Sequence, residues 1–314
     1  MIVVTGGLGF IGSNLVHALN ARGREDLIVV DDFTDGRKMA NLRGATLGDY
    51  HDRRAFLARF EPLSRQGTGI ELVYHLGACS DTTEWDGRRM MDDNFAYSRD
   101  LLDLCEVRGI PFVYASSAAV YGLSARCVEE PRSEAPLNVY GYSKLAFDQH
   151  VRQRLGRARS RIVGLRYFNV YGPRERHKGR MASVVFHFDE QLKRDGVLRL
   201  FGASHGVGPG EQRRDFIHVD DVVAQTLWCG ETAGVSGIYN CGTGTAASFN
   251  AVARAVIAWH GRGDIEYIPF PADLLGAYQA HTLADLERTR AAGYLRRARA
   301  VEAGVRDYLD WLNP

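Results

Sequence analysis

The sequence predicts an α/β protein with a doubly wound parallel sheet and a smaller mixed C-terminal domain. Short apolar, β-branched runs alternate with segments of helical spacing along the first half of the chain. The expected strands are 2–5, 27–30, 71–76, 111–115 and 161–165. The expected helices are 13–22, 92–107 and 140–154. Such alternation is typical of a parallel sheet covered by helices on both faces, and right-handed crossovers make it doubly wound.

The regular alternation weakens after about residue 170, and the segment 196–210 is rich in glycine. We therefore expect two domains that exchange segments of the chain. The nucleotide-binding domain should comprise residues 1–170 and 215–244, and the substrate-binding domain residues 171–214 and 245–314.

Composition narrows the class of protein. The 314 residues carry a formal net charge of +1, so no global field attracts nucleic acid or an anionic membrane, and we expect neither as a partner. The five cysteines are odd in number and show neither a Cys-x-x-Cys pair nor a metal-ligand spacing. No signal peptide and no membrane-spanning run is evident, so a metal-free protein of the reducing cytoplasm is expected.

A glycine-rich turn joins the first strand to the first helix. Gly6, Gly9 and Gly12 form the pattern G-x-x-G-x-x-G, and Asp31 ends the second strand 19 residues beyond Gly12. Glycines let the backbone approach a pyrophosphate at a helix N-terminus. The alternative is a tight strand–helix turn, but the flanking elements and the strand-end acid favour a Rossmann-type dinucleotide site.

The choice between NAD and NADP stays open on these residues. Asp31 at the end of the strand would accept hydrogen bonds from ribose hydroxyls and favours NAD, and Asp32 adds to the negative field. Basic residues that could neutralise a 2′-phosphate follow in the next loops: Arg37, Lys38, Arg53 and Arg54.

Tyr140 and Lys144 lie one helical turn apart on one face of the expected helix. A fixed ammonium ion would lower the pKa of the phenol and make it a usable acid/base. Ser116 and Ser117 end the strand 111–115, at the edge where α/β sheets bind ligands. Tyr142 is a rival phenol, but its spacing takes it off the face of Lys144.

These motifs, with Ser117–Gly122 and Arg214–Val219, resemble the extended short-chain dehydrogenases/reductases that act on sugar nucleotides. More specific segments are similar to the ADP-L-glycero-D-manno-heptose 6-epimerase family, and the likeness runs over nearly the whole chain. These segments are Gly77–Gly87, Phe168–Arg174, His177–Gly179, Met181–Ser183, Glu266–Phe270 and Gln279–Thr282.

The resemblance implies epimerisation of ADP-D-glycero-β-D-manno-heptose at C6″, a step in the synthesis of lipopolysaccharide core precursors. It implies a transient ketone, bound NADP and a homo-oligomer, with a pentamer as the expected form. The implied catalytic residues are Ser117, Tyr140, Lys144 and Lys178. The implied cofactor contacts are Gly6, Gly9, Phe10, Ile11, Gly12, Asp31, Asp32, Lys38, Arg53, Leu76, Gly77, Ala78, Cys79, Ser80, Asp93, Lys144, Val170 and Lys178.

The implied substrate contacts are Ser117, Asn169, Arg180, His187, Phe201, Gly202, Ala203, Ser204, Arg214 and Tyr278. The chain departs from the family at four of the implied positions. Arg53 stands for a lysine, Asp32 for a common asparagine, and Arg180 for a serine. An asparagine of the family falls on Asp93, with Asn94 beside it.

Several residues have plain structural alternatives. Arg214 could form a salt bridge with Asp215 or Asp221, His187 could be packed in an apolar stretch, and Lys178 could be a loop lysine in water or on a phosphate. Rival functions are a UDP-hexose 4-epimerase, a 4,6-dehydratase and a non-catalytic NADP-binding protein. Ala118 and Ala119 stand where a dehydratase needs an Asp-Glu pair, which counts against that chemistry.

Overall fold

The structure is a computed structural model that describes residues 1–65, 67, 69–271 and 278–314. The chain forms two compact units. The first comprises Met1–Val120, Pro136–Arg166 and Val223–Tyr239. The second comprises Tyr121–Ala135, Tyr167–Val222 and Asn240–Pro314.

A seven-stranded parallel sheet is the framework of the first unit, which confirms the predicted fold class. Its strands, in spatial order, are β11 (Gly237–Cys241), β6 (Ile162–Tyr167), β5 (Phe112–Ser117), β4 (Leu72–His75), β1 (Ile2–Thr5), β2 (Leu27–Asp31) and β3 (Asp49–Asp52). β1 pairs in parallel with both β2 and β4, so chain order reverses beside β1. Ligands of doubly wound sheets bind at the carboxyl ends of the strands at such a reversal.

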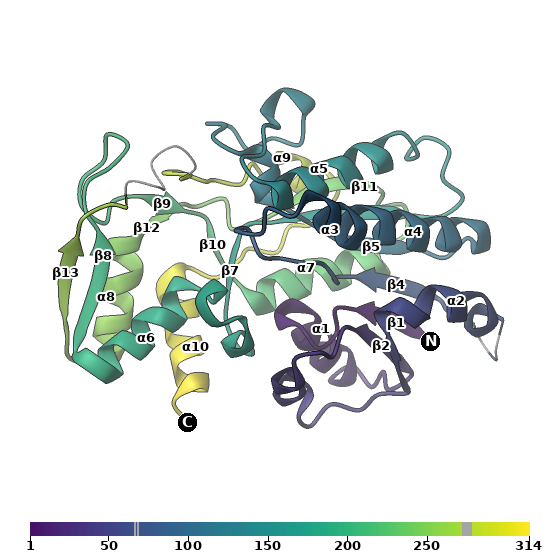
Figure 1. Cartoon of the computed structure of the whole chain (residues 1–314), viewed down its shortest axis with the longest axis horizontal. Helices are drawn as coiled ribbons and strands as arrows, with labels where there is room; N and C mark the ends of the chain where they lie inside the picture. Colours follow the sequence, from purple (N-terminus) through teal and green to yellow (C-terminus); the bar gives the residue numbers. More distant parts are fainter. Residues whose placement is uncertain (66, 68, 272–277) are drawn as a thin grey trace. The chain divides into compact units, whose positions relative to one another are not determined.

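Helices cover both faces of this sheet, and Figure 1 shows α1 (Phe10–Asn20) and α7 (Val219–Glu231) on the side opposite α4 (Tyr97–Arg108) and α5 (Val139–Arg152). Side chains of α2 (Arg53–Ser64), α4 and α5 pack with the strands in one apolar core. Fully buried aromatic residues of that core, among them Phe56, Phe60 and Phe112, hold the helices on the sheet.

The expected helix over 92–107 begins earlier and is irregular. It runs through α3 (Gly87–Met91), a π-helical turn at Asp92–Ala96 and α4, which ends at Gly109 with φ of +67°. The strand β3 was not predicted, because its sequence Asp-Tyr-His-Asp carries no apolar run and lies at the sheet edge. Charged residues suit an edge strand, because they discourage further pairing.

The second unit contains three small sheets. β7 (Asn169–Tyr171) pairs in parallel with β10 (Phe216–His218), and β8 (Val197–Phe201) with β13 (Asp264–Ile268). β9 (Arg213–Arg214) pairs antiparallel with β12 (Ala247–Ser248). The segments 121–135, 167–170, 215–222 and 240–244, which were expected in the nucleotide-binding domain, lie in the second unit. The β7–β10 pair explains two of them, because these strands bond to each other outside the large sheet.

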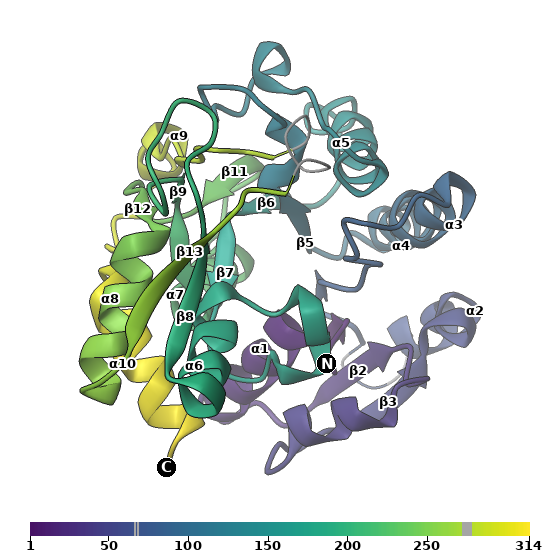
Figure 2. The same ribbon diagram turned by 60° about the vertical axis from the view of Figure 1, so that its left-hand side comes forward.

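Three helices carry the second apolar core: α6 (Val184–Asp195), α8 (Phe249–His260) and α10 (Val301–Leu312). Figure 2 shows them beside β8 and β13. The shorter elements of this unit include η4 (Pro131–Ser133), η5 (Arg176–Met181) and α9 (Glu287–Ala291). Asp189 of α6 is fully buried and accepts hydrogen bonds from Lys193 at 2.6 Å and from Asn313 at 3.3 Å, and it lies 2.9 Å from a ring nitrogen of His260.

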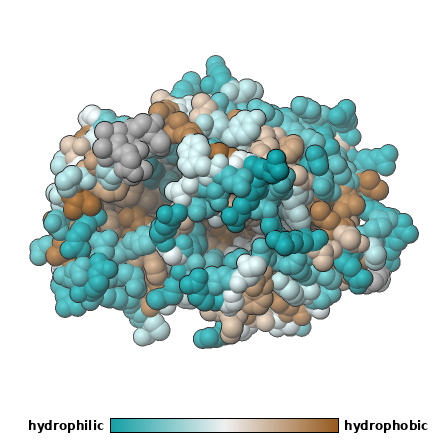
Figure 3. Space-filling model, in the orientation of Figure 1, coloured by the Kyte–Doolittle hydropathy of each residue, from teal (hydrophilic) through white to brown (hydrophobic). Residues whose placement is uncertain are grey.

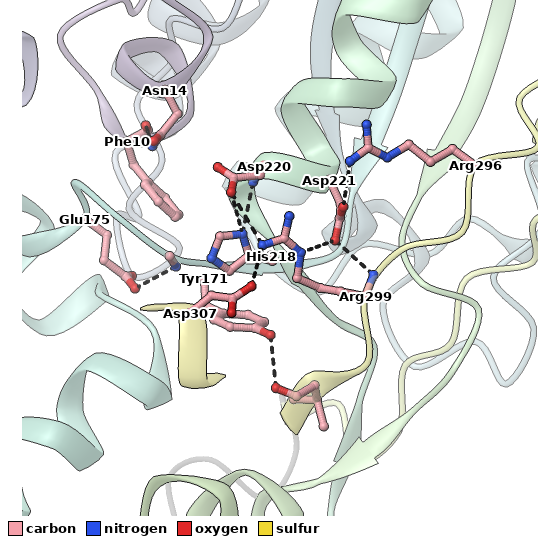
Figure 4. A network of polar contacts seen from close by, with 12 residues as sticks. Phe10, Asn14, Tyr171, Glu175, His218, Asp220, Asp221, Arg296, Arg299 and Asp307 are labelled. Carbon is pink, nitrogen blue, oxygen red and sulfur yellow. Dashed lines mark hydrogen bonds and ion pairs between the residues drawn. The ribbon is translucent and has the colours of Figure 1, made fainter. Parts of the chain in front are cut away.

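Ion pairs fix the start of α10 in the second unit (Figure 4). Arg299 lies 3.1 Å from Asp221 and 3.0 Å from Asp307, and the Tyr171 hydroxyl donates to the carbonyl of Val301 at 3.4 Å. Asp221 therefore has basic partners in the segment before α10.

No helix in the described ranges is long and apolar enough to cross a membrane. The face seen in Figure 3 is mainly hydrophilic, and its hydrophobic residues lie in separate patches.

Candidate active site

The turn after β1 has no room for side chains at two of its glycines. A Cβ on Gly12 would lie 2.1 Å from the carbonyl oxygen of Gly6, and one on Gly6 would lie 2.6 Å from the nitrogen of Gly77. Gly6 also has φ of +67°. The turn ends at Gly9, the N-cap of α1, which makes no side-chain cap hydrogen bond. The positive end of the α1 dipole at this terminus fits the negative charge of a pyrophosphate. The residues present thus fit a dinucleotide.

Asp31 ties this turn to the end of β2. One carboxylate oxygen accepts a hydrogen bond of 2.9 Å from the backbone N–H of Leu8, and the other accepts one of 3.0 Å from Lys38. Lys38 also donates to the carbonyl of Asp32 at 3.1 Å. The predicted acid and the predicted cation are therefore direct partners.

Arg53 lies among carboxylates at the neighbouring strand end. It donates a hydrogen bond of 2.7 Å to Asp93, and its Nε lies 3.6 Å from Asp32. The first unit thus brings Asp31, Asp32, Lys38, Arg53 and Asp93 into one charged cluster. Two fixed cations in such a cluster can pair with a phosphate.

The loop Leu76–Ser80 follows β4 and is held by Asn94, which is 1% exposed. The Asn94 amide accepts from the Cys79 N–H at 2.8 Å and donates to the Cys79 carbonyl at 2.9 Å. It also donates to the hydroxyl of Ser143 at 3.0 Å. Asn94 lies in the π-helical turn, and such turns are frequent at functional sites.

The sequence analysis named Asp93 as the implied cofactor contact and Asn94 only as its neighbour. The two side chains form hydrogen bonds with different parts of the site. Asp93 bonds to Arg53, whereas Asn94 bonds to the loop. His75, at the end of β4, is a second residue missed by the sequence. Its ring nitrogens lie 2.7 Å from the hydroxyls of Thr5 and Ser98, and burial lowers its pKa to about 3. It is therefore a neutral connector within the core.

Tyr140, Lys144 and Ser117 meet within the first unit. Asn138 caps α5 by accepting from the Gly141 N–H at 2.8 Å, which places Tyr140 in the first turn. The Tyr140 hydroxyl bonds with Ser117 at the end of β5. Lys144, 5% exposed, donates a 3.0 Å hydrogen bond to the carbonyl of Ala115. Tyr142 points to solvent and is 56% exposed, which agrees with its predicted place off this face.

The expected effect on the phenol is wrong for this arrangement. Burial raises the pKa of Tyr140, and the hydrogen bond with Ser117 only partly opposes that rise. The ammonium of Lys144 is directed at Ala115, and burial lowers the lysine pKa to about 8. The phenol is therefore a protonated acid near neutral pH, beside a lysine close to its own titration point.

An aromatic and cationic cluster forms in the second unit. The guanidinium carbon of Arg214 lies 4.7 Å from the ring centroid of Tyr278 and 5.8 Å from that of Phe249. Phe201 lies 6.3 Å from Tyr278 and 5.2 Å from Phe270, ring centroid to ring centroid.

The suggested salt bridges of Arg214 are not formed. Asp215 instead accepts from the backbone of Thr243, Gly244 and Ala284, and Asp221 pairs with Arg299. Arg214 is 7% exposed, and no carboxylate of the described residues pairs with it.

The other expected substrate residues lie in several elements of the second unit. Ser204 accepts a 2.8 Å hydrogen bond from Gln212, Gly202 donates to the carbonyl of Ile268 at 2.7 Å, and Ala203 is exposed. In β7, Asn169 is exposed and accepts from the Thr282 hydroxyl at 3.3 Å, and Val170 is half-buried.

Lys178 and Arg180 lie in η5, where Gly179 has φ of +54°. Burial lowers the pKa of Lys178, and the Glu175 carboxylate opposes this shift. A ring nitrogen of His187 in α6 lies 3.3 Å from the carbonyl of Arg180, so His187 is not simply packed among apolar residues.

Comparison with known proteins identifies the family. A model of the NAD dependent epimerase/dehydratase family matches residues 2–242. The chain is 59% identical over 311 residues to the ADP-L-glycero-D-manno-heptose-6-epimerase of Alkalilimnicola ehrlichii, covering 99% of this chain and 97% of that protein. The chain belongs to the ADP-L-glycero-D-manno-heptose-6-epimerase family.

Solved structures agree with this membership. The structure of the Helicobacter pylori ADP-L-glycero-D-manno-heptose-6-epimerase is 31% identical, with a TM-score of 0.87 over 99% of this chain and 95% of that one. The Thermus thermophilus UDP-glucose 4-epimerase, solved in complex with NAD, is 27% identical, with a TM-score of 0.79 over 98% and 97%. This heptose-epimerase family member is therefore an isomerase with a nicotinamide cofactor.

Proposed function

We propose that the protein converts ADP-D-glycero-β-D-manno-heptose to ADP-L-glycero-β-D-manno-heptose at C6″, with bound NADP, in the synthesis of lipopolysaccharide core precursors. The observation that carries this proposal is the convergence of Tyr140, Ser117 and Lys144 at the carboxyl edge of the sheet. The name of the relative that is 59% identical supports the substrate.

The nicotinamide cofactor supplies a reversible hydride acceptor, so that the substrate carbon can be oxidised to a ketone and reduced again without net oxidation. The glycine turn and the N-terminus of α1 would hold its pyrophosphate. Lys38 and Arg53 are the groups that would pair with a 2′-phosphate, which supports NADP, whereas Asp31 and Asp32 also suit the free hydroxyls of NAD. The loop Leu76–Ser80 would contact the cofactor in this proposal.

Tyr140 is the proton-transfer group of the proposal. Its protonated phenol donates a proton to the substrate oxygen as the ketone is reduced, and the phenolate regains a proton through solvent before the next turnover. Ser117, bonded to the phenol, holds the same substrate oxygen. Lys144 orients the cofactor ribose and places a positive charge near the phenolate that forms.

Inversion needs proton transfer on two faces of the ketone. C6″ is exocyclic, so the ketone can present its second face while the ADP stays anchored. We assign the removal of the C6″ hydroxyl proton, as the ketone forms, to Lys178, because burial lowers its pKa and favours the neutral amine that can accept a proton. Arg180, His187 and Asn169 are proposed to surround the heptose.

Arg214 is proposed to bind the diphosphate. A buried guanidinium without a carboxylate partner is costly, and a bidentate phosphate removes that cost. Tyr278 and Phe201 lie beside it and offer aromatic surface to the nucleotide, with Gly202–Ser204 at the end of β8.

We further propose that the enzyme works in the cytoplasm as a homo-oligomer, with five copies as the expected assembly.

The test is direct. Purified protein is incubated with ADP-D-glycero-β-D-manno-heptose and, in parallel, with UDP-galactose, and the products are resolved by NMR. Conversion of the heptose alone supports the proposal, and conversion of UDP-galactose alone replaces it with a UDP-hexose 4-epimerase. Conversion of neither, with intact cofactor binding, indicates a non-catalytic NADP-binding protein. Acid release of the cofactor and mass measurement separates NADP from NAD.

A further inference from the structure

Asp148 extends the catalytic face of α5 into the core. Tyr140, Lys144 and Asp148 follow at intervals of four residues along the helix, so they share one face. Asp148 is fully buried, with 0% of its surface exposed. A buried carboxylate persists only when it is paired and hydrogen-bonded.

Its partners come from two neighbouring strands. Asp148 accepts hydrogen bonds from the hydroxyls of Tyr114 at 2.8 Å and Ser116 at 2.9 Å, both in β5. Arg166 of β6, also 0% exposed, donates from Nε at 2.8 Å, and its Nη2 lies 2.8 Å from the same carboxylate oxygen. One carboxylate thus joins a helix to two strands at the catalytic edge.

Tyr114 and Ser116 flank Ala115, and the Ala115 carbonyl is the acceptor for Lys144. Ser117, which bonds with Tyr140, is the next residue of the same strand. By holding the residues on both sides of Ala115, Asp148 fixes the carbonyl that orients the lysine and the backbone that carries the serine.

Among the described residues, the charges that act on Lys144 are those of Asp148 on its own helix and Cys79 after β4, and Lys144 in turn acts on His75 in β4. Tyr140 precedes Lys144 by one turn of α5, and Tyr114 of β5 and Arg166 of β6 face Asp148. His75 is neutral, because burial lowers its pKa to about 3. Asp148 is therefore the carboxylate among these groups that favours the protonated lysine, against the desolvation that lowers its pKa to about 8.

We propose that Asp148 is a positioning residue of the active site: it fixes Ala115 through Tyr114 and Ser116, and its charge keeps Lys144 an ammonium ion. This inference rests on the proposed function for its catalytic meaning. The protonation of Lys144 can nevertheless be measured without any substrate.

The experiment compares the holoenzyme with its Asp148→Asn variant by ¹³C NMR of labelled lysine side chains. The chain has four lysines, Lys38, Lys144, Lys178 and Lys193, so the Lys144 signal is assigned from a Lys144→Met protein. In Asp148→Asn the Lys144 midpoint should fall by about one pH unit, a tenfold change in its proton affinity. The alkaline limb of kcat/KM should move to lower pH by the same amount.

Asp189→Asn is the matched control, because Asp189 is an equally buried carboxylate that holds Lys193 and His260 in the second unit. It should lower stability without moving the Lys144 midpoint. Ser116→Ala keeps the charge and removes one hydrogen bond, so it should lower kcat several-fold with the pH limb unchanged. A Lys144 midpoint that is the same in Asp148→Asn and wild type overturns the inference.

The proposed function and the proposed role of Asp148 can be refuted independently of each other. A wild-type protein that converts no ADP-heptose removes the proposed function, while the NMR titration still decides the role of Asp148. If Asp148→Asn does not fold, the pair variant Asp148→Asn/Arg166→Met replaces it, because removing both charges of a buried pair is tolerated better than removing one. Loss of the Arg166 charge opposes loss of the Asp148 charge, but only Asp148 is among the charges that act on Lys144. The Lys144 midpoint of the pair variant should therefore still lie below that of the wild type, by less than in Asp148→Asn, and an unchanged or higher value overturns the inference.

Discussion

Arg53 and Asp93 are joined by a hydrogen bond of 2.7 Å at the cofactor end of the sheet. Asp32 lies 3.6 Å from the other side of the same guanidinium, so Arg53 bridges two acids of different elements. The arginine is therefore held in place before any ligand arrives, which lowers the entropy cost of binding a phosphate.

Replacing Arg53 by methionine should weaken NADP binding by about tenfold or more, because a charge-assisted contact to the 2′-phosphate is worth roughly 1.5–3 kcal/mol. NAD has no such phosphate, and its affinity should stay within about threefold. Calorimetric titration of both cofactors measures the ratio. Arg54→Met, an exposed neighbour, is the control and should change neither affinity. Equal losses for NADP and NAD would contradict a 2′-phosphate contact at Arg53.

Gly12→Ala should destabilise the protein and abolish cofactor binding. Its Cβ would meet the Gly6 carbonyl oxygen at 2.1 Å and the Gly7 Cα at 2.9 Å, so the backbone of the turn must move. Overpacking of this kind costs about 1–3 kcal/mol. Gly156→Ala is the control, because nothing lies within 4 Å of its added Cβ. Thermal unfolding with and without NADP measures both effects, and normal cofactor-induced stabilisation of Gly12→Ala would exclude the proposed pyrophosphate turn.

The parts of this site that depend on local pattern could be predicted from the sequence. The glycine turn, the strand end at Ser117 and the Tyr140–Lys144 face each follow from short-range spacing and from a flanking strand or helix. The direction of the Tyr140 pKa shift could not be predicted, because it depends on burial and on the group to which Lys144 donates its hydrogen bond.

The contacts made by Asn94 and Asp148 also could not be predicted from the sequence. Asn94 bonds to Cys79 from a π-helical turn, and the shift of backbone hydrogen bonds that defines such a turn has no propensity signal. Asp148 meets Arg166 across two elements that are 18 residues apart in the chain. Strand β3 could not be predicted either, because its polar sequence lacks the apolar run by which strands are recognised.

Arg214→Met should weaken ADP binding by about 10–100-fold while leaving the protein as stable as wild type or more so. Burial lowers the pKa of Arg214, which shows that the free site disfavours its charge, and an apolar side chain removes that cost. Calorimetry with ADP and thermal unfolding give the two readouts. Arg213→Met is the matched control, since Arg213 is exposed and donates to the Ala246 carbonyl at 3.0 Å. Undiminished ADP affinity in Arg214→Met would remove Arg214 from the proposed diphosphate site.

Tyr140→Phe and Lys178→Met together test the assignment of two proton-transfer groups. Each should lower kcat by about 10²–10⁴-fold, the range for loss of one general acid/base, with the affinity for ADP unchanged. The reason lies in their opposite pKa shifts: burial raises the pKa of the phenol and so keeps its proton, and burial lowers the pKa of the lysine and so brings its neutral form within reach.

These shifts also set the pH dependence of the two variants. Below the folded pKa of Lys178 the ammonium form dominates and cannot accept a proton, so a rate limited by this lysine rises with pH until that pKa is passed. Lys178→Met should lose this rise, whereas Tyr140→Phe should keep it. Rates of the two variants from pH 6 to 9 measure the difference. A Lys178→Met protein with full turnover would leave Tyr140 to serve both faces of the ketone.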